Sequence, residues 1–164
     1  MPYDPSWSVF YEEEKSRILQ AIGECVVDID HIGSTAVPGL SAKPIIDIMA
    51  GLRGPSDAEV CLPLLGELGY DDVTPEPEED DWYYCLGRGI HSIGYHLHLV
   101  KAGSQFQDRH ILFRDYLRTS QEDARRYQVL KERLAFEYRD MREEYANAKT
   151  EFIESIIEKA KKSV

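Results

Sequence analysis

Cysteine, basic charge and long apolar runs are all scarce in this sequence, and each shortage narrows what the chain can be. Its 164 residues include 3 cysteines, Cys25, Cys61 and Cys85, whose odd number and wide spacing suit neither a disulfide framework nor a zinc knuckle. No stretch approaches the roughly 18 apolar residues of a membrane helix, and the N-terminus lacks the basic and apolar parts of a signal peptide. We therefore expect a cytoplasmic protein with no membrane partner.

The shortage of basic residues also bears on binding partners. The chain has 19 basic and 30 acidic residues, a formal net charge of −11. Most of the excess acid lies in residues 1–100, including an acidic run at 76–81 that reads as a solvated loop. Non-specific binding to nucleic acid requires broad neutralisation of phosphates, so no nucleic-acid partner is expected. A phosphate-bearing ligand would need a few local cations or a metal ion, and the cations are concentrated after residue 100.

The order of apolar patterns predicts an α/β (α+β) fold. No linker, repeat or low-complexity block divides the chain, so residues 1–164 are interpreted as one domain. Period-2 and β-branched patterns predict four or five strands, in a sheet core of about residues 24–101. Helical patterns predict a helical part at about residues 104–162. The expected strands are 26–32, 45–48, 70–75, 82–86 (closed by glycines at 87–89) and 95–100, and the expected helices are 6–22, 56–68, 105–117, 120–139 and 143–161.

One stretch, residues 31–49, has the layout of a phosphate-handling site. A strand runs directly into Gly33, Ser34 and Thr35, and a second β-branched strand carries a lone acid, Asp47. Glycine lets the backbone approach an anion closely, while the serine and threonine offer hydroxyl and amide groups. Asp47 could hold a hard cation that bridges phosphate oxygens. Lys43, at the start of the second strand, would bring an ammonium group near the same phosphate.

Two histidines stand on the last expected strand. His96 and His98 are two residues apart, so both imidazoles project from one face of the strand. They are either hydrogen-bonded histidines beside the core, or groups that ligate a metal together with Asp47 or act as a general base.

The C-terminal helices repeat a tyrosine–lysine spacing. Tyr127 and Lys131, and again Tyr145 and Lys149, are four residues apart and therefore lie on one helix face with apolar neighbours. A lysine on such a face either extends its ammonium to solvent along the edge of the apolar stripe or binds an anionic ligand. In the second case Lys131 or Lys149 would hold phosphate, and a tyrosine such as Tyr145 would stack on a base. Arg114 either pairs with its neighbour Asp115 or contributes to the same ligand site.

The stretch from His31 to Met49 resembles the signature of the GrpB family, which is placed in the nucleotidyltransferase superfamily. The superfamily pattern is a strand, Gly-Ser, and about ten residues later an Asp-x-Asp or Asp-x-Glu on the next strand. Gly33, Ser34 and Asp47 match it, whereas Met49 stands in place of the second acid. That departure argues against two-metal chemistry. The resemblance covers nearly the whole chain and implies a nucleotidyltransferase-like small mixed sheet with flanking helices and a helical C-terminal part.

The resemblance implies a nucleotidyltransferase that moves a nucleotidyl group from a nucleoside triphosphate to a small-molecule acceptor. Asp47, His96 and His98 would be the catalytic residues, with a divalent metal ion (Mg²⁺, Mn²⁺ or a transition metal) on Asp47 and His98. The nucleotide would be bound by Gly33, Ser34, Thr35, Lys43, Arg114, Lys131, Tyr145 and Lys149. The alternative is a non-catalytic protein that binds a nucleotide or phosphorylated metabolite, which Met49 favours. Family members fused to dephospho-coenzyme A kinase point to ligands related to coenzyme A.

Overall fold

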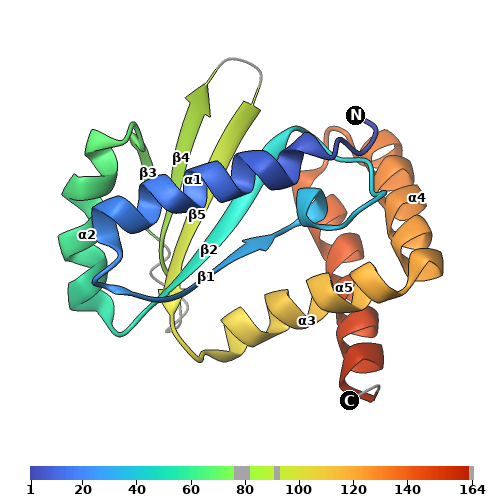
Figure 1. Ribbon diagram of the computed structural model, residues 1–164. Coiled ribbons are helices and arrows are strands. Elements are labelled where there is room, and N and C mark those ends of the chain that lie inside the picture. The colour runs from blue at the N-terminus through green and yellow to red at the C-terminus, as the bar shows by residue number, and fades with distance from the viewer. Residues whose placement is uncertain (76–81, 91–92, 163–164) are drawn as a thin grey trace.

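The structure, a computed structural model, describes residues 1–75, 82–90 and 93–162, so the predicted acidic loop at 76–81 lies outside the described residues. Helices and strands follow one another in a mixed order, with three helices at the C-terminal end (Figure 1). The elements are α1 (Ser6–Ile22), β1 (Val26–Ile32), the short 3₁₀ helix η1 (Ser34–Ala36), β2 (Ile45–Leu52), α2 (Pro55–Glu67), β3 (Asp72–Pro75), β4 (Trp82–Ile90), β5 (Ile93–Lys101), α3 (Gln105–Thr119), α4 (Gln121–Glu137) and α5 (Arg142–Lys162).

The described strands form one five-stranded mixed sheet, as expected. Its order is β1-β2-β5-β4-β3, in which β2 and β5 are parallel and every other pair is antiparallel. The expected end of β4 at residues 87–89 is wrong, because the strand continues to Ile90. Gly87 and Gly89 stay in the ladder opposite His96 and Gly94, so glycine here does not interrupt the pairing.

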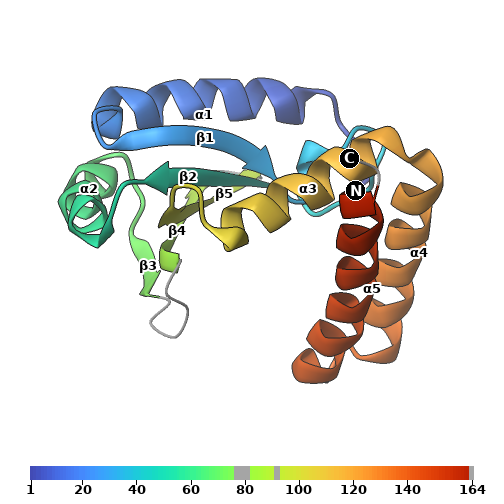
Figure 2. The same cartoon turned by 90° about the horizontal axis from the view of Figure 1, so that it is seen from below.

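The two faces of the sheet are used differently. Ile46, Ile48 and Leu97 point into the main apolar core, together with residues of α1 and α2. The alternate residues of the same strands, including Asp47 and His96, belong to the opposite face. Figure 2 shows α1 along one side of the sheet and α3 on the other, with α4 and α5 side by side at one end. The period-2 alternation thus separates the face of the main core from a face that has a polar cluster around Asp47 and a small apolar cluster around Met49.

The C-terminal helices have their own apolar core. Leu117, Tyr127 and Ile156, from α3, α4 and α5, pack together with Val37 and Leu40 of the loop after η1. Ser120 caps α4, since its Oγ accepts a hydrogen bond from the Asp123 amide at 3.3 Å. α1 is preceded by Pro5 and α2 by Gly54, and neither residue caps its helix through a side chain. None of the described helices has both the length and the apolar character needed to cross a membrane.

Candidate functional site

Asp47 is the centre of a small polar cluster on the sheet. It lies opposite His96 in the parallel ladder of β2 and β5, and His98 follows two residues later on the same face. Asp47 Oδ1 is 3.5 Å from both His96 Nδ1 and His98 Nε2. Side-chain exposure is 15% for His98 and 47% for His96, so one imidazole is enclosed and the other faces solvent. The structure therefore brings together the three residues predicted as catalytic.

The contacts between these groups stabilise their charged forms. Burial alone would raise the pKa of Asp47, but hydrogen bonds from His96 and His98 lower it to about 2. Burial alone would lower the pKa of His98, but its hydrogen bonds to Asp47 and Cys85 raise it to about 9. At neutral pH the pair is thus an aspartate beside an imidazolium. A metal ion that binds Asp47 and His98 would have to displace the imidazolium proton.

The turn between β1 and η1 is built against the Asp47 carboxylate. Gly33 has φ 77° and ψ −174°, a conformation that is essentially restricted to glycine. A Cβ at this position would lie 2.6 Å from Asp47 Oδ2. Glycine is therefore required for two reasons, the backbone conformation and the space occupied by Asp47.

A buried hydrogen-bond chain holds η1 in place. Thr35 Oγ1 donates to the Ile45 carbonyl at 3.0 Å and lies 2.9 Å from His31 Nε2. Burial lowers the pKa of His31 to about 4, so the ring is neutral at pH 7. Because the Thr35 hydroxyl proton is already donated to Ile45, the Nε2–H of His31 donates to Thr35 Oγ1. The His31 ring also stacks on Tyr11, with centroids 4.8 Å apart. His31 and Thr35 thereby tie η1 to the start of β2.

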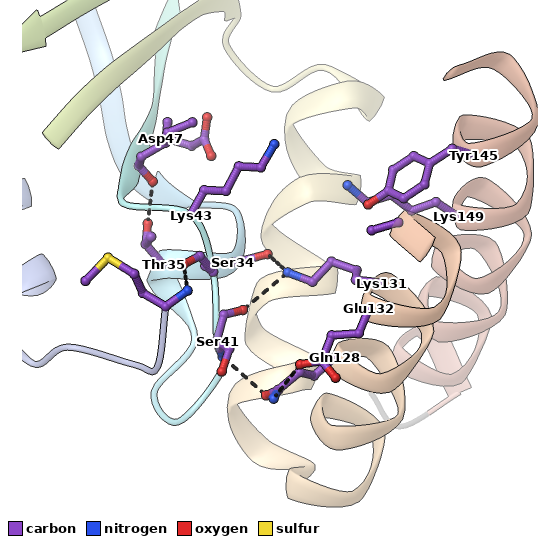
Figure 3. A pocket seen from close by; sticks show the side chains of 14 residues that line it. Ser34, Thr35, Ser41, Lys43, Asp47, Gln128, Lys131, Glu132, Tyr145 and Lys149 are labelled. Carbon is purple, nitrogen blue, oxygen red and sulfur yellow. Dashed lines mark hydrogen bonds between the residues drawn. The ribbon is translucent and has the colours of Figure 1, made fainter. Parts of the chain in front are cut away.

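A cavity of about 480 Å³ opens beside this turn, between η1, the start of β2 and the helices α4 and α5. Three lysines that are far apart in the sequence line it, Lys43 before β2, Lys131 on α4 and Lys149 on α5 (Figure 3). Lys131 Nζ donates to Ser34 Oγ at 2.7 Å and lies 5.0 Å from the centre of the Tyr127 ring. The described residues lining the cavity are Met1, Ser34, Thr35, Ser41, Ala42, Lys43, Ile45, Asp47, Gln128, Lys131, Glu132, Ala135, Tyr145 and Lys149.

The lysines of the cavity destabilise one another's charges. Burial, followed by the charge of Lys149, lowers the pKa of Lys131 to about 8. Burial also lowers the pKa of Lys149. The carboxylate of Asp47 raises this pKa, whereas the charge of Lys43 lowers it further. Ammonium groups held together in a partly desolvated space are stabilised by an anion. The arrangement is that of an anion-binding pocket.

Most of the predicted binding residues meet at this cavity. Ser34, Thr35, Lys43, Lys131 and Lys149 all line it, as do Tyr145 and Asp47. Gly33 packs against the Asp47 side chain, and His96 and His98 contact the Asp47 carboxylate.

Arg114 and Met49 lie elsewhere. The Arg114 guanidinium pairs with its neighbour Asp115 at 2.8 Å, the first of the two predicted alternatives, and also with Asp30 at 2.9 Å. It donates to the His31 carbonyl at 3.1 Å, and the described lining of the cavity does not include it. Met49, at the position of the missing second acid, is fully buried among Ile32, Val100 and Phe106. A carboxylate at position 49 would therefore sit in an apolar cluster.

Gln128 and Ser41 are among the lining residues that were not predicted from the sequence. Gln128 Oε1 accepts a hydrogen bond from the Ser41 amide at 3.2 Å, which joins α4 to the loop before β2. Gln128 is three residues before Lys131 on the same helix face, a spacing that could have indicated it. Ser41 lies in an irregular loop, where no periodic pattern applies.

The described residues contain no group of three or more histidine, cysteine, aspartate or glutamate side chains arranged to hold a metal ion. Asp47 with His98 offers two such groups. A metal bound there would therefore complete its coordination with water or with oxygen atoms of the ligand, as Mg²⁺ commonly does.

Comparison with known proteins places these observations in a family. The family model described as "GrpB protein" matches residues 1–159. UPF0157 protein BH1888 of Halalkalibacterium halodurans is 35% identical over 162 residues, covering 98% of this chain and 80% of that protein. UPF0157 protein YqkA of Bacillus subtilis is 34% identical over 98% of this chain, which spans only 46% of YqkA.

The fold has a solved counterpart, the crystal structure of the conserved protein GrpB from Enterococcus faecalis. The TM-score is 0.85 and the identity 32%, over 99% of this chain and 97% of that one. A shorter match, 35% identical over 99 residues, is to a dephospho-CoA kinase of Mycobacterium tuberculosis; it covers 56% of this chain and 24% of the kinase.

Proposed function

This chain belongs to the GrpB family, and on that premise we propose that it is a nucleotidyltransferase, which transfers a nucleotidyl group from a nucleoside triphosphate to a small-molecule acceptor. The observation that carries the proposal is the convergence of Lys43, Lys131 and Lys149 on one cavity that also contains Ser34 and Asp47. Three cations beside a serine hydroxyl suit a polyphosphate, which has several negative oxygens to neutralise.

Each group of the cavity has a role in this proposal. The lysine ammonium groups bind the phosphates and neutralise the charge that develops on the departing pyrophosphate. Asp47, with His98 in its neutral form, would hold a divalent metal ion, which would supply further neutralisation of the phosphate charge. The ring of Tyr145, which lines the cavity, packs against the base of the nucleotide. Catalysis by such a site consists mainly of positioning and charge stabilisation.

A second candidate is a non-catalytic protein that binds a nucleotide or another phosphorylated metabolite. The burial of Met49 favours it, because Asp47 then lacks the second carboxylate with which a two-metal site is normally built. The partial match to a dephospho-CoA kinase supports a ligand related to coenzyme A in this case. Both candidates use the same phosphate-binding lysines.

Thermal unfolding with nucleoside triphosphates, with and without Mg²⁺ or Mn²⁺, tests the binding. A ligand that binds only the folded state raises the melting temperature according to its concentration and affinity. We expect a metal-dependent increase with the wild type and none with Asp47→Asn. Lys149→Met should weaken nucleotide binding by about 10- to 100-fold, since a hydrogen bond to a charged group contributes about 1.5–3 kcal/mol.

The control for this experiment is Lys161→Met. Lys161 is also on α5 but is exposed and paired with Glu158, so nucleotide binding should not change. A melting temperature insensitive to nucleotides, or an equal response in the wild type and Lys149→Met, would contradict the proposal. Release of pyrophosphate from labelled ATP in the presence of a metabolite pool separates the two candidates, because a binding protein releases none.

A further inference from the structure

The contact between Ser34 and Lys131 has the geometry of a nucleophile and its base. The two residues are 97 positions apart, yet Lys131 Nζ lies 2.7 Å from Ser34 Oγ. The sharp turn at Gly33 precedes Ser34, which is the first residue of η1, and its hydroxyl faces the cavity (Figure 3). The amine is held from the other side by the Ser41 carbonyl at 3.5 Å and by the Tyr127 ring. Both reacting groups are thus positioned before any ligand binds.

The surroundings of Lys131 favour its neutral form. Burial and the ammonium of Lys149 lower its pKa to about 8, while Glu132 acts in the opposite direction. The other titratable groups that line the cavity are the Met1 amino group, Lys43, Asp47 and Tyr145. The Tyr127 hydroxyl also faces Ser34. A lysine of this pKa is partly unprotonated near neutral pH, and in that form it accepts the proton of the serine hydroxyl instead of donating to its oxygen.

We propose that Ser34 is a nucleophile for phosphorus and Lys131 its general base, so that transfer passes through a covalent nucleotidyl-serine. This inference rests on the proposed function and adds a two-step route to it. In the first step the bond between Ser34 Oγ and the α-phosphorus forms, the bond from that phosphorus to pyrophosphate breaks, and the hydroxyl proton goes to Lys131 Nζ. Pyrophosphate leaves with the bonding electron pair.

In the second step the acceptor hydroxyl attacks the same phosphorus. The bond from phosphorus to Ser34 Oγ breaks, the serine oxygen takes back the proton from Lys131, and the proton of the acceptor goes to water. The overall change is the ordinary transfer of a nucleotidyl group with release of pyrophosphate and one proton. In this route Lys131 is the base and not a phosphate-binding cation in the first step, so Lys43 and Lys149 are the lysines that stabilise the charge on the phosphorus oxygens in both steps.

This route requires no acidic residue at the position of Met49. In a two-metal site, one ion lowers the pKa of the attacking hydroxyl, which requires several carboxylates. Here Met49 is buried in an apolar cluster. A serine activated by a lysine provides an attacking oxygen without a second metal ion.

A fluorophosphonate probe tests the inference, because it forms a phosphorus–oxygen bond with an activated serine and releases fluoride. We expect one adduct per chain, mapped to Ser34 by mass spectrometry and absent from Ser34→Ala. The labelling rate should increase about tenfold per pH unit up to about pH 8 and then level off, as Lys131 loses its proton. In Lys149→Met the inflection should move to higher pH, because the ammonium that lowers the pKa of Lys131 is gone.

Two variants of Lys131 separate a base from a binding cation. Lys131→Arg keeps the positive charge but cannot accept a proton, and Lys131→Met removes both properties. Both should lower the labelling rate by about 100-fold or more, while Lys131→Arg retains nucleotide-dependent stabilisation. The controls are Ser155→Ala and Lys161→Met, whose side chains are exposed on α5, and both should be labelled like the wild type. Circular dichroism confirms that each variant is folded.

The inference fails if Ser34 is not labelled, or if its labelling in Lys131→Arg equals that of the wild type. The proposed function is judged separately by the melting temperature with nucleotides. Stabilisation by nucleotides without labelling of Ser34 would leave the nucleotidyltransferase in place and remove the covalent step. Labelling of Ser34 without any nucleotide response would instead remove the nucleotide as the substrate.

Discussion

Single residues of the site are held in unusual states by their neighbours. His98 is charged at neutral pH because it contacts Asp47, whereas His31, on the adjoining strand β1, is neutral because burial dominates. Histidine thus supplies a cation beside Asp47, at position 98, and a neutral hydrogen-bond donor to Thr35, at position 31. The difference arises from the carboxylate that faces His98.

Asp47→Asn should lower the pKa of His98 from about 9 towards its ordinary value of about 6.5, because the negative partner is lost. A raised pKa stabilises the folded state at pH values below the unfolded value of about 6.5, and this contribution is lost as the pH rises through about 9. NMR titration of the imidazole resonances measures the shift directly. In the same spectra His31 should stay neutral above about pH 4, and a wild-type His98 that titrates near 6.5 would show that the ion pair does not form.

At the scale of elements, the turn from β1 into η1 sets the position of the site. Helix and strand order were predicted well, because apolar periodicity and serine or glycine punctuation are local signals. Glycine at position 33 was expected because it lets the backbone approach a bound anion closely, whereas its close approach to the Asp47 carboxylate depends on the pairing of β1 with β2. Periodicity contains no information about such a contact.

Gly33→Ala should destabilise the protein by about 3 kcal/mol or more, from the sum of backbone strain and the clash with Asp47. Gly39→Ala is the matched control, since Gly39 has φ 85° but has no atom within 4 Å of an added Cβ. It should cost about 1 kcal/mol, the strain alone. Urea unfolding of the two variants measures the difference, and equal losses would mean that the approach to Asp47 has no energetic consequence.

At the scale of the whole molecule, the sheet separates a structural face from a functional one. The core beneath α1 contains an ion pair between Glu14 and Arg88, whose side chains are 2% and 5% exposed. Arg88 also packs over the rings of Tyr70 and Tyr95, and Glu14 accepts from the Tyr70 hydroxyl at 3.1 Å. None of these residues is among the described residues that line the cavity.

Arg88→Met should therefore destabilise the protein without changing its ligand affinity. Loss of Arg88 leaves the buried Glu14 carboxylate with Arg17, at 3.2 Å, and the Tyr70 hydroxyl as its partners. Because Arg17 is partly exposed, the expected cost is about 3 kcal/mol, the lower end of the range for a broken buried ion pair. The double variant Glu14→Met with Arg88→Met should recover much of this loss. Urea unfolding measures the free energy of unfolding. The rate of fluorophosphonate labelling of Ser34, at a temperature where each variant is folded, measures whether the site is intact. A labelling rate that changes with stability would show that the two faces are coupled.

The sequence by itself determined the element order, the alternation of apolar and polar residues across the sheet, and the Gly33-Ser34 turn with Asp47 on the next strand. These features depend on residues a few positions apart, so local periodicity and turn chemistry are enough to predict them. Only the tertiary structure decided that Lys131 reaches Ser34, that Lys43, Lys131 and Lys149 share one cavity, and that Arg114 pairs with Asp30 as well as with its neighbour Asp115. The packing of α4 and α5 at the end of the sheet brings these distant residues together, and no spacing in the chain specifies that packing.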